Sequence, residues 1–140
     1  MPKRKSQFAD AHGLDEPVLS GVDAARVVEH GLSVDSVDRL LRLGFDKREV
    51  FRLVIPQRTL THRKQRREVL TGDESDKTVR LARIRDLAVR VFGDERKAWQ
   101  WLRTRKKSFD GRAPVDLLMT ETGARAVEQE LYRIDEGMFA

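Results

Sequence analysis

The sequence predicts an all-α protein, and three observations support this fold class. Apolar residues recur along the chain at helical spacing, and no stretch alternates as a half-buried strand would. Gly31, Gly44 and Gly93 each follow such a periodic segment, at the place where helices commonly end. Pro56 separates an apolar stretch from a basic one, and the residue before a proline is driven out of the α region.

Four short helices are predicted in residues 20–70, after a flexible arm over residues 1–19. The first three follow Ser20, Ser33 and Asp46, whose side chains are good helix caps. Their inner faces are expected to carry Ala24, Val27 and Val28, then Val37, Leu40, Leu41 and Leu43, and finally Val50, Phe51, Leu53 and Val54. The fourth helix is expected to run from about Gln57 to Leu70.

The segment "TGDES" at 71–75 predicts a turn and the start of a second domain, which spans 71–140. The longest helix is expected from about Asp76 to Phe92, and Asp94 can cap the next one. In that helix Ala98, Trp101 and Leu102 share a face, and Trp101 is expected in the core. A loop, "RKKSFDGRAP", leads to a short helix that Pro114 can start. A final helix spans 121–137, with Ala124, Val127, Leu131 and Ile134 facing inward.

Positive charge is concentrated in one window of the chain. Residues 47–67 contain eight Lys or Arg residues and one acid, Glu49, so this window has a net charge of +7. The whole chain has a net charge of +5, so the other residues together are close to neutral. A focused basic patch is typical of a polyanion-binding surface, and a solvated helix face gives the same pattern. Charge alone therefore leaves both interpretations open.

The residues of this window fit a helix-turn-helix over 46–67. Val50 and Leu53 supply the inner face of the first helix, Ile55 fills the turn, and Leu60 anchors the second helix. Such turns often have a glycine where this chain has Val54. The DNA-binding residues predicted on the second helix include Thr59, the small polar residue near its start. The others are Gln57, Arg58, Thr61 and His62, which face the major groove, and Arg63, Lys64, Arg66 and Arg67, which contact the DNA backbone. A helical hairpin with a basic surface remains the alternative.

Composition argues against several other classes of protein. No window approaches the roughly 20 apolar residues that span a bilayer, and the N-terminus lacks the apolar run of a secretory signal. The chain has no cysteine, which excludes disulfides and fits a reducing cytoplasm, where we expect the protein. His12, His30 and His62 have no metal-ligand spacing, and no phosphate loop or nucleophile elbow is present. We expect no catalytic site, no metal and no cofactor.

Over roughly residues 20–140 the sequence resembles the Xre/MbcA/ParS family of bacterial antitoxins. The motifs that carry the resemblance are "IPQRTLTHR" (55–63), "DESDKTVRLARI" (73–84), "AWQWL" (98–102) and "GRAPVDLLMTETGARAVEQELYRIDEG" (111–137). The resemblance implies an Xre-type helix-turn-helix domain over 20–70 and a toxin-binding domain over 71–140. It also implies a cognate toxin, often of the RES type that consumes NAD, whose NAD cleft the C-terminal region covers. Repression of its own promoter through operator DNA and homodimerisation are further expectations.

Within the C-terminal half we single out the candidate toxin-binding residues Trp99, Arg103, Asp135, Glu136, Gly137, Met138, Phe139 and Ala140. Trp99 is offset from the apolar face of its helix, so it either packs on the long helix or projects toward a partner. The tail either folds back or occupies a toxin groove. Asp135 and Glu136 could meet basic groups that hold NAD phosphates.

For other residues of this half the sequence predicts a structural role or leaves a solvated surface as one alternative. Gly111, Pro114, Thr120, Thr122 and Gly123 are predicted to be architectural, with Thr120 or Thr122 as a cap. Arg105, Lys106 and Lys107 form either a second contact surface or a solvated loop. Two alternatives to the antitoxin interpretation stay open: a stand-alone transcription regulator whose C-terminal half dimerises, and a basic protein that binds RNA or DNA without sequence preference.

Overall fold

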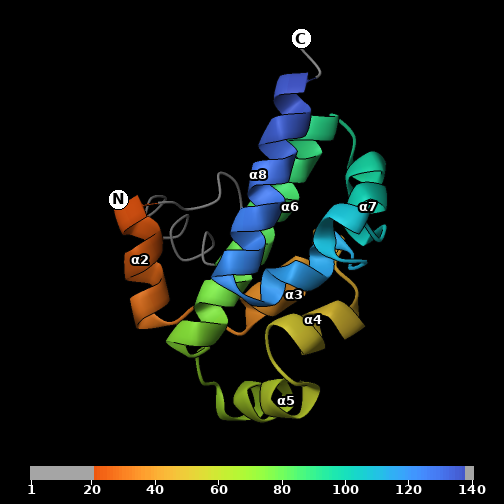
Figure 1. The fold of residues 1–140 in the computed structure, drawn as a ribbon. Coiled ribbons are helices and arrows are strands. Elements are labelled where there is room, and N and C mark those ends of the chain that lie inside the picture. The colour runs from red at the N-terminus through yellow and green to blue at the C-terminus, as the bar shows by residue number, and fades with distance from the viewer. Residues whose placement is uncertain (1–20, 138–140) are drawn as a thin grey trace. The chain divides into compact units, whose positions relative to one another are not determined.

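The computed structural model describes residues 21–137, and its helices confirm the all-α fold class. By its contacts the chain divides at Ala82–Arg83, inside the longest helix. The first unit contains α2 (Gly21–His30), α3 (Asp35–Arg42), α4 (Lys47–Leu53), α5 (Gln57–Arg66) and the start of α6 (Gly72–Phe92). The second contains the rest of α6, α7 (Glu95–Arg103), the 3₁₀ helices η1 (Lys107–Phe109) and η2 (Pro114–Met119), and α8 (Glu121–Gly137) (Figure 1).

The core of the first unit is formed by residues that the helical periodicity and the turns bring inside. α3 packs on α4. The side chains buried in this unit include Leu32, Val37, Leu40, Phe45, Val50, Leu53, Ile55, Leu60, Leu70 and Leu81. The arm predicted over residues 1–19 and the Ser20 cap lie outside the described residues.

The start of α4 is confirmed, and that of α3 is close to the prediction. The Asp46 carboxylate accepts from the Glu49 backbone N–H at 2.8 Å, and the Glu49 carboxylate accepts from the Asp46 N–H at 2.9 Å. This reciprocal capping box satisfies two amides that would otherwise lack partners. Ser33 lies one residue before the N-cap position, which Val34 occupies without a side-chain capping bond, and the Ser33 hydroxyl still accepts from the Asp35 N–H at 3.2 Å.

The prediction was wrong at the junction between α5 and α6. α5 ends at Arg66, four residues early, because Arg67 adopts a left-handed conformation with φ of 56°. α6 begins at Gly72 rather than Asp76, because Thr71 and Glu74 form a second capping box, with N–H to oxygen distances of 2.8 and 3.1 Å. The segment expected as a turn is therefore largely the first turn of α6.

The second unit is built around η2. Both α7 and α8 pack on this short helix. α8 lies along the part of α6 that belongs to this unit (Figure 1), where Arg83 forms ion pairs with Glu121 at 3.2 Å and Glu128 at 3.7 Å. Ala124, Val127 and Leu131 of α8 are buried as predicted, and Ile134 is half-buried.

The contact between η2 and α8 depends on a glycine. A Cβ added at Gly123 would lie 2.0 Å from the Leu117 carbonyl oxygen, so only glycine allows this approach. The Gly123 N–H donates to the Thr120 hydroxyl at 3.0 Å, which confirms Thr120 as the cap of α8. Thr120 and Gly123 thus have the architectural role that was predicted.

Candidate functional site

The candidate site of the first unit is the α4–α5 pair, joined by a tight turn. Val50, Leu53 and Ile55 are at most 1% exposed, so the predicted inner face is confirmed. Val54, which stands where glycine is frequent, has φ of −119° and ψ of −61°, so its backbone needs no positive φ. Leu60 is 7% exposed and fixes α5 from within. The geometry is that of a helix-turn-helix with one side of α5 turned to solvent.

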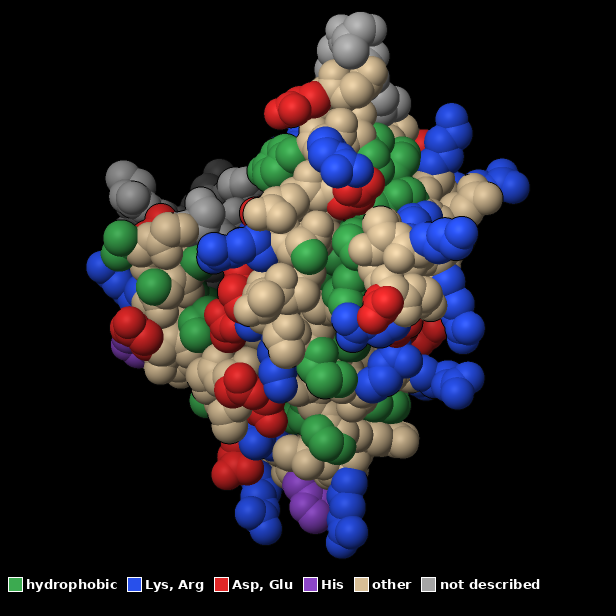
Figure 2. All heavy atoms as spheres, viewed as in Figure 1, with side chains coloured by type: hydrophobic (Ala, Val, Ile, Leu, Met, Phe, Trp, Pro, Cys, Tyr) green, Lys and Arg blue, Asp and Glu red, His purple; other side chains and the backbone are tan. Residues whose placement is uncertain are grey.

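The open side of α5 carries most of the residues predicted from sequence. Gln57, Arg58, Thr61, His62 and Arg66 are all exposed, whereas Thr59 is half-buried. Figure 2 shows Lys, Arg and His side chains gathered at the surface over α5. Gln65 is also exposed, and it is seven residues from Arg58 and three from His62, so it shares their face of the helix. Sequence analysis missed Gln65, although this spacing could have identified it.

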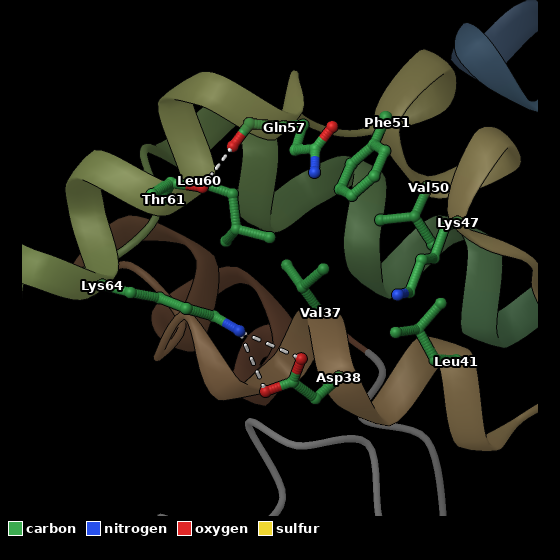
Figure 3. Close-up of a pocket in the computed structure, with 10 residues that line it drawn as sticks. All are labelled: Val37, Asp38, Leu41, Lys47, Val50, Phe51, Gln57, Leu60, Thr61 and Lys64. Atoms are coloured by element: carbon green, nitrogen blue, oxygen red, sulfur yellow. Dashed lines mark hydrogen bonds and ion pairs between the residues drawn. The ribbon is translucent and has the colours of Figure 1, made fainter.

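A hollow of about 260 Å³ lies between α3, α4 and α5 (Figure 3). Its lining is Val37, Asp38, Leu41, Lys47, Val50, Phe51, Gln57, Leu60, Thr61 and Lys64. Gln57 and Thr61 border this hollow, and the Thr61 hydroxyl donates to the Gln57 carbonyl at 3.0 Å. Arg58 and His62 are not part of the lining. Together with Arg66, which does not line it either, they are the exposed members of the set that lie outside the hollow.

Two of the residues predicted to contact the DNA backbone, Lys64 and Arg63, are already paired with acids of this chain. The Lys64 ammonium lies 3.1 Å from the Asp38 carboxylate of α3 (Figure 3), and both side chains are about 40% exposed. The Arg63 guanidinium forms an ion pair with the Glu74 carboxylate of α6, where the exposed fractions are 18% and 12%. Arg58, Arg66 and Arg67 are exposed and make no ion pair with any residue of the described part of the chain.

The electrostatics of Glu74 reflect this pairing. Burial alone would raise the pKa of the Glu74 carboxyl group, but hydrogen bonds from Arg63 and from the Thr71 backbone outweigh it and lower the pKa. The carboxylate is therefore ionised at neutral pH and neutralises Arg63.

In the second unit the prediction for Trp101 was wrong, and Trp99 is buried, which fits the packed one of its two predicted alternatives. Trp99 is 8% exposed, and the Arg103 guanidinium carbon lies 4.1 Å from the centre of its ring. Trp101, expected in the core, is only half-buried, and its ring centre lies 5.8 Å from that of Phe92 and 6.4 Å from that of Phe109. Of the two rings, Trp101 is the one more accessible to a partner.

Trp101 also lines an open hollow of about 460 Å³ together with Lys97 and Lys106. The Lys106 ammonium lies 5.2 Å from the centre of the Trp101 ring. Burial lowers the pKa of Lys106, and the nearby Glu130 carboxylate acts in the opposite direction. The loop after α7 is not extended throughout, because Lys106 and Arg112 form an isolated antiparallel bridge around η1.

The remaining candidate toxin-binding residues lie at the end of α8. Asp135 is half-buried, and Glu136 and Gly137 are exposed. Met138, Phe139 and Ala140 lie outside the described residues. The site therefore has a surface on α5 and a second group of candidates on α7 and α8, in different units of the chain.

Within residues 21–137 no group of His, Asp and Glu side chains could hold a metal ion, and no helix is long and apolar enough to cross a membrane. Fold and site together define the class of protein: a helix-turn-helix protein with a helical second unit.

Comparison with known proteins identifies both parts of the chain. Residues 23–83 match the antitoxin Xre-like helix-turn-helix domain, and residues 87–137 match the antitoxin Xre/MbcA/ParS C-terminal toxin-binding domain. The chain is 36% identical to an "Antitoxin Xre" of Yersinia enterocolitica over 127 residues, which cover 89% of this chain and 86% of that protein. An "Antitoxin Xre" of Photorhabdus laumondii is 32% identical over 125 residues, covering 87% and 84%.

A third relative, an "Antitoxin Xre" of Pseudomonas putida, is 44% identical over 84 residues, covering 60% of this chain and 53% of that protein. The chain belongs to the Xre/MbcA/ParS family of antitoxins. It is accordingly an antitoxin with a helix-turn-helix domain and a toxin-binding domain, and not an enzyme.

Proposed function

We propose that the protein neutralises a RES-type toxin that degrades NAD, by covering the toxin's NAD cleft with its C-terminal region. We further propose that it represses its own operon through α5. The observation that carries the DNA half is the exposed side of α5, where Arg58, Arg66 and Arg67 have no acidic partner among the described residues. The toxin half is supported by the match of residues 87–137 to a toxin-binding domain.

On DNA, the exposed side of α5 would enter the major groove. Gln57 and Arg58 lie in the first turn of the helix, from which recognition helices contact base edges, and His62 follows Arg58 by one turn on the same face. Arg66 and Arg67 at the end of the helix suit phosphates, which give affinity without sequence information. A homodimer would present two such helices to half-sites about 34 Å apart.

On the toxin, the contact would involve Arg103, which lies over the buried Trp99 ring, and the end of α8 with the residues that follow. The acids Asp135 and Glu136 make no ion pair with the described residues, so they are available to basic groups of a partner. A cleft that binds the phosphates of NAD contains such groups, and carboxylates placed there would exclude the nucleotide.

Co-expression with the neighbouring gene tests the toxin half. We expect the neighbour to arrest growth and deplete cellular NAD, and the full chain to reverse both effects. Since α8 runs to Gly137, a chain truncated after Gly137 keeps this helix and loses only residues 138–140. Failure of this truncation to rescue growth would place the inhibitory contact in those residues, whereas equal rescue would place it in the folded helices.

A harmless neighbour would refute the toxin half and leave a stand-alone regulator. The DNA half is tested separately, by titrating the purified full chain onto a labelled fragment of its own promoter. Replacing Arg58 and His62 with Ala should abolish the preference for this fragment over random DNA. Unchanged operator affinity in that double variant would refute the assignment of α5 as the recognition helix.

A further inference from the structure

The basic residues of α5 fall into two groups that sequence alone does not separate. Arg58, Arg66 and Arg67 are exposed and make no ion pair with the described residues, whereas Lys64 is paired with Asp38 and Arg63 with Glu74. The Arg63 and Glu74 side chains are only 18% and 12% exposed, so both charges have lost most of their water. In that position the Glu74 carboxylate neutralises the Arg63 charge and occupies part of its N–H donors, so the guanidinium is poorly placed to bind a phosphate.

Glu74 is held rigidly by its own neighbours. Its carboxylate accepts from the Thr71 N–H at 2.8 Å, and its backbone N–H donates to the Thr71 hydroxyl at 3.1 Å. The carboxylate thus closes the first turn of α6 and at the same time receives the Arg63 guanidinium of α5. One group joins the beginning of α6 to the last turn of α5.

The connection between the two helices is itself fixed to the segment after α2. The Leu70 N–H donates to the Leu32 carbonyl at 2.8 Å, and the Leu32 N–H donates to the Ser75 hydroxyl at 2.9 Å. A Cβ at Gly31 would lie 2.5 Å from the Leu70 carbonyl oxygen, so the two segments are as close as their backbones allow. Glu74 therefore projects from a part of the unit that has little freedom to move.

We propose that Arg63 is a positioning residue for DNA recognition: through Glu74 it sets the orientation of α5, and it does not contact DNA. The inference rests on the proposed DNA-binding role of α5 and divides its cations by task. Arg66 and Arg67 neutralise phosphates, Arg58 faces base edges, and Arg63 holds the helix in place. A small rotation of a recognition helix separates its side chains from base edges, so affinity falls although the positioning residue itself contacts no DNA.

Neutralising Glu74 distinguishes the two roles by the sign of the effect. If Arg63 bound phosphate, Glu74→Gln would release this cation and remove a repelling anion, so DNA affinity would rise. If Arg63 positions α5, the same substitution weakens operator binding, and we expect a loss of about five- to tenfold. Asp73→Asn is the matched control, because Asp73 is the adjacent acid and pairs with Lys77 of its own helix at 3.0 Å. This control should leave affinity unchanged or raise it slightly.

The dependence of affinity on salt provides the second readout. Log affinity falls as log salt concentration rises, and each lost phosphate contact makes this negative slope less steep by about 0.9. Arg66→Ala and Arg67→Ala should make the slope less steep, whereas Arg63→Ala and Glu74→Gln should reduce affinity at every salt concentration and leave the slope unchanged. The double variant of Arg63→Ala with Glu74→Gln should bind no more weakly than either single variant, since both remove one interaction.

The measurements use the full chain and a promoter fragment, with circular dichroism confirming that each variant is folded at the assay temperature. If Glu74→Gln does not fold, Glu74→Asp serves instead: it keeps the charge and shortens the side chain, so it should weaken binding only if the pair positions α5. Stronger binding by Glu74→Gln, or a reduced slope in Arg63→Ala, overturns the proposal. If Arg58→Ala binds the operator as tightly as the native chain, DNA binding by α5 itself is refuted. That result bears on the proposed function and is distinct from the test of Arg63.

Discussion

Replacing Gly123 with Ala should destabilise the second unit, although Gly→Ala changes inside helices usually stabilise. The added Cβ would lie 2.0 Å from the Leu117 carbonyl oxygen and 3.0 Å from the carbonyl carbon. Carbon and oxygen atoms normally approach no closer than about 3.3 Å, so α8 and η2 must separate by more than 1 Å or so. The obstacle is backbone rather than a flexible side chain, and it cannot rotate away.

The magnitude follows from opposing contributions. Overpacking of this kind costs about 3 kcal/mol, and alanine in place of glycine returns about 1 kcal/mol of helix propensity. Unwinding the first turn of α8 would relieve the clash, but it would lose the Thr120 cap, worth about 1 kcal/mol, and part of the packing of Ala124. We expect a net loss of about 2 kcal/mol, which corresponds to a midpoint lower by about 10 °C for a unit of this size.

The assay is urea and thermal denaturation of the full chain followed by circular dichroism. Gly137→Ala is the matched control, because Gly137 belongs to the same helix and a Cβ there meets nothing within 4 Å. The control should be neutral or slightly more stable. If Gly123→Ala is as stable as Gly137→Ala, the approach of Leu117 is not what requires glycine at this position, and our reasoning about the η2–α8 contact is wrong.

Three further predictions concern other parts of the chain. Gly31→Ala should destabilise the protein more than Gly93→Ala, because both glycines have positive φ but only a Cβ at Gly31 meets other atoms within 4 Å; equal midpoints in denaturation would contradict this. Because the folded-state pKa of Glu74 is lowered, its carboxylate stabilises the fold at neutral pH, and this contribution is lost as the pH falls through that pKa. Glu74→Gln should therefore lose less stability than the native chain between about pH 5 and pH 3, measured by denaturation at each pH. Trp99→Ala should lower stability by about 3 kcal/mol, and Trp101→Ala by clearly less, since Trp99 is buried and Trp101 is half-buried; similar losses in urea denaturation would refute this assignment.

The parts of the fold that sequence predicted well depend on local signals. Asp46 and Asp94 each precede an apolar periodic segment, and both cap the helix that follows. The start of α6 could also have been predicted, because Thr71 and Glu74 have the spacing of a capping box. The glycine and the acid between them suggested a turn instead. The end of α5 could not be predicted, because Arg67 has a left-handed backbone although it is neither Gly nor Asn.

Periodicity was ambiguous at the tryptophans for a geometric reason. Ala98 and Leu102 are four residues apart, and either Trp99 or Trp101 completes a helical face with them. The choice is made by the neighbours of α7 in space, which a single sequence does not reveal.

The same limit applies to the charges of α5. Asp38 and Glu74, which neutralise Lys64 and Arg63, lie 26 and 11 residues away in the chain. A count of basic residues in a window includes cations whose partners lie outside it. The structure therefore reduces the free charge on α5 without changing its sequence.

The distribution of aromatic residues has a spectroscopic consequence. The chain contains two tryptophans and one tyrosine, Trp99, Trp101 and Tyr132, and all three belong to the unit that follows Ala82. Intrinsic fluorescence excited near 280 nm or above therefore originates in the toxin-binding unit alone, and the helix-turn-helix unit is silent. Comparing fluorescence with circular dichroism, which detects all helices, would show whether the two units unfold together or in separate transitions.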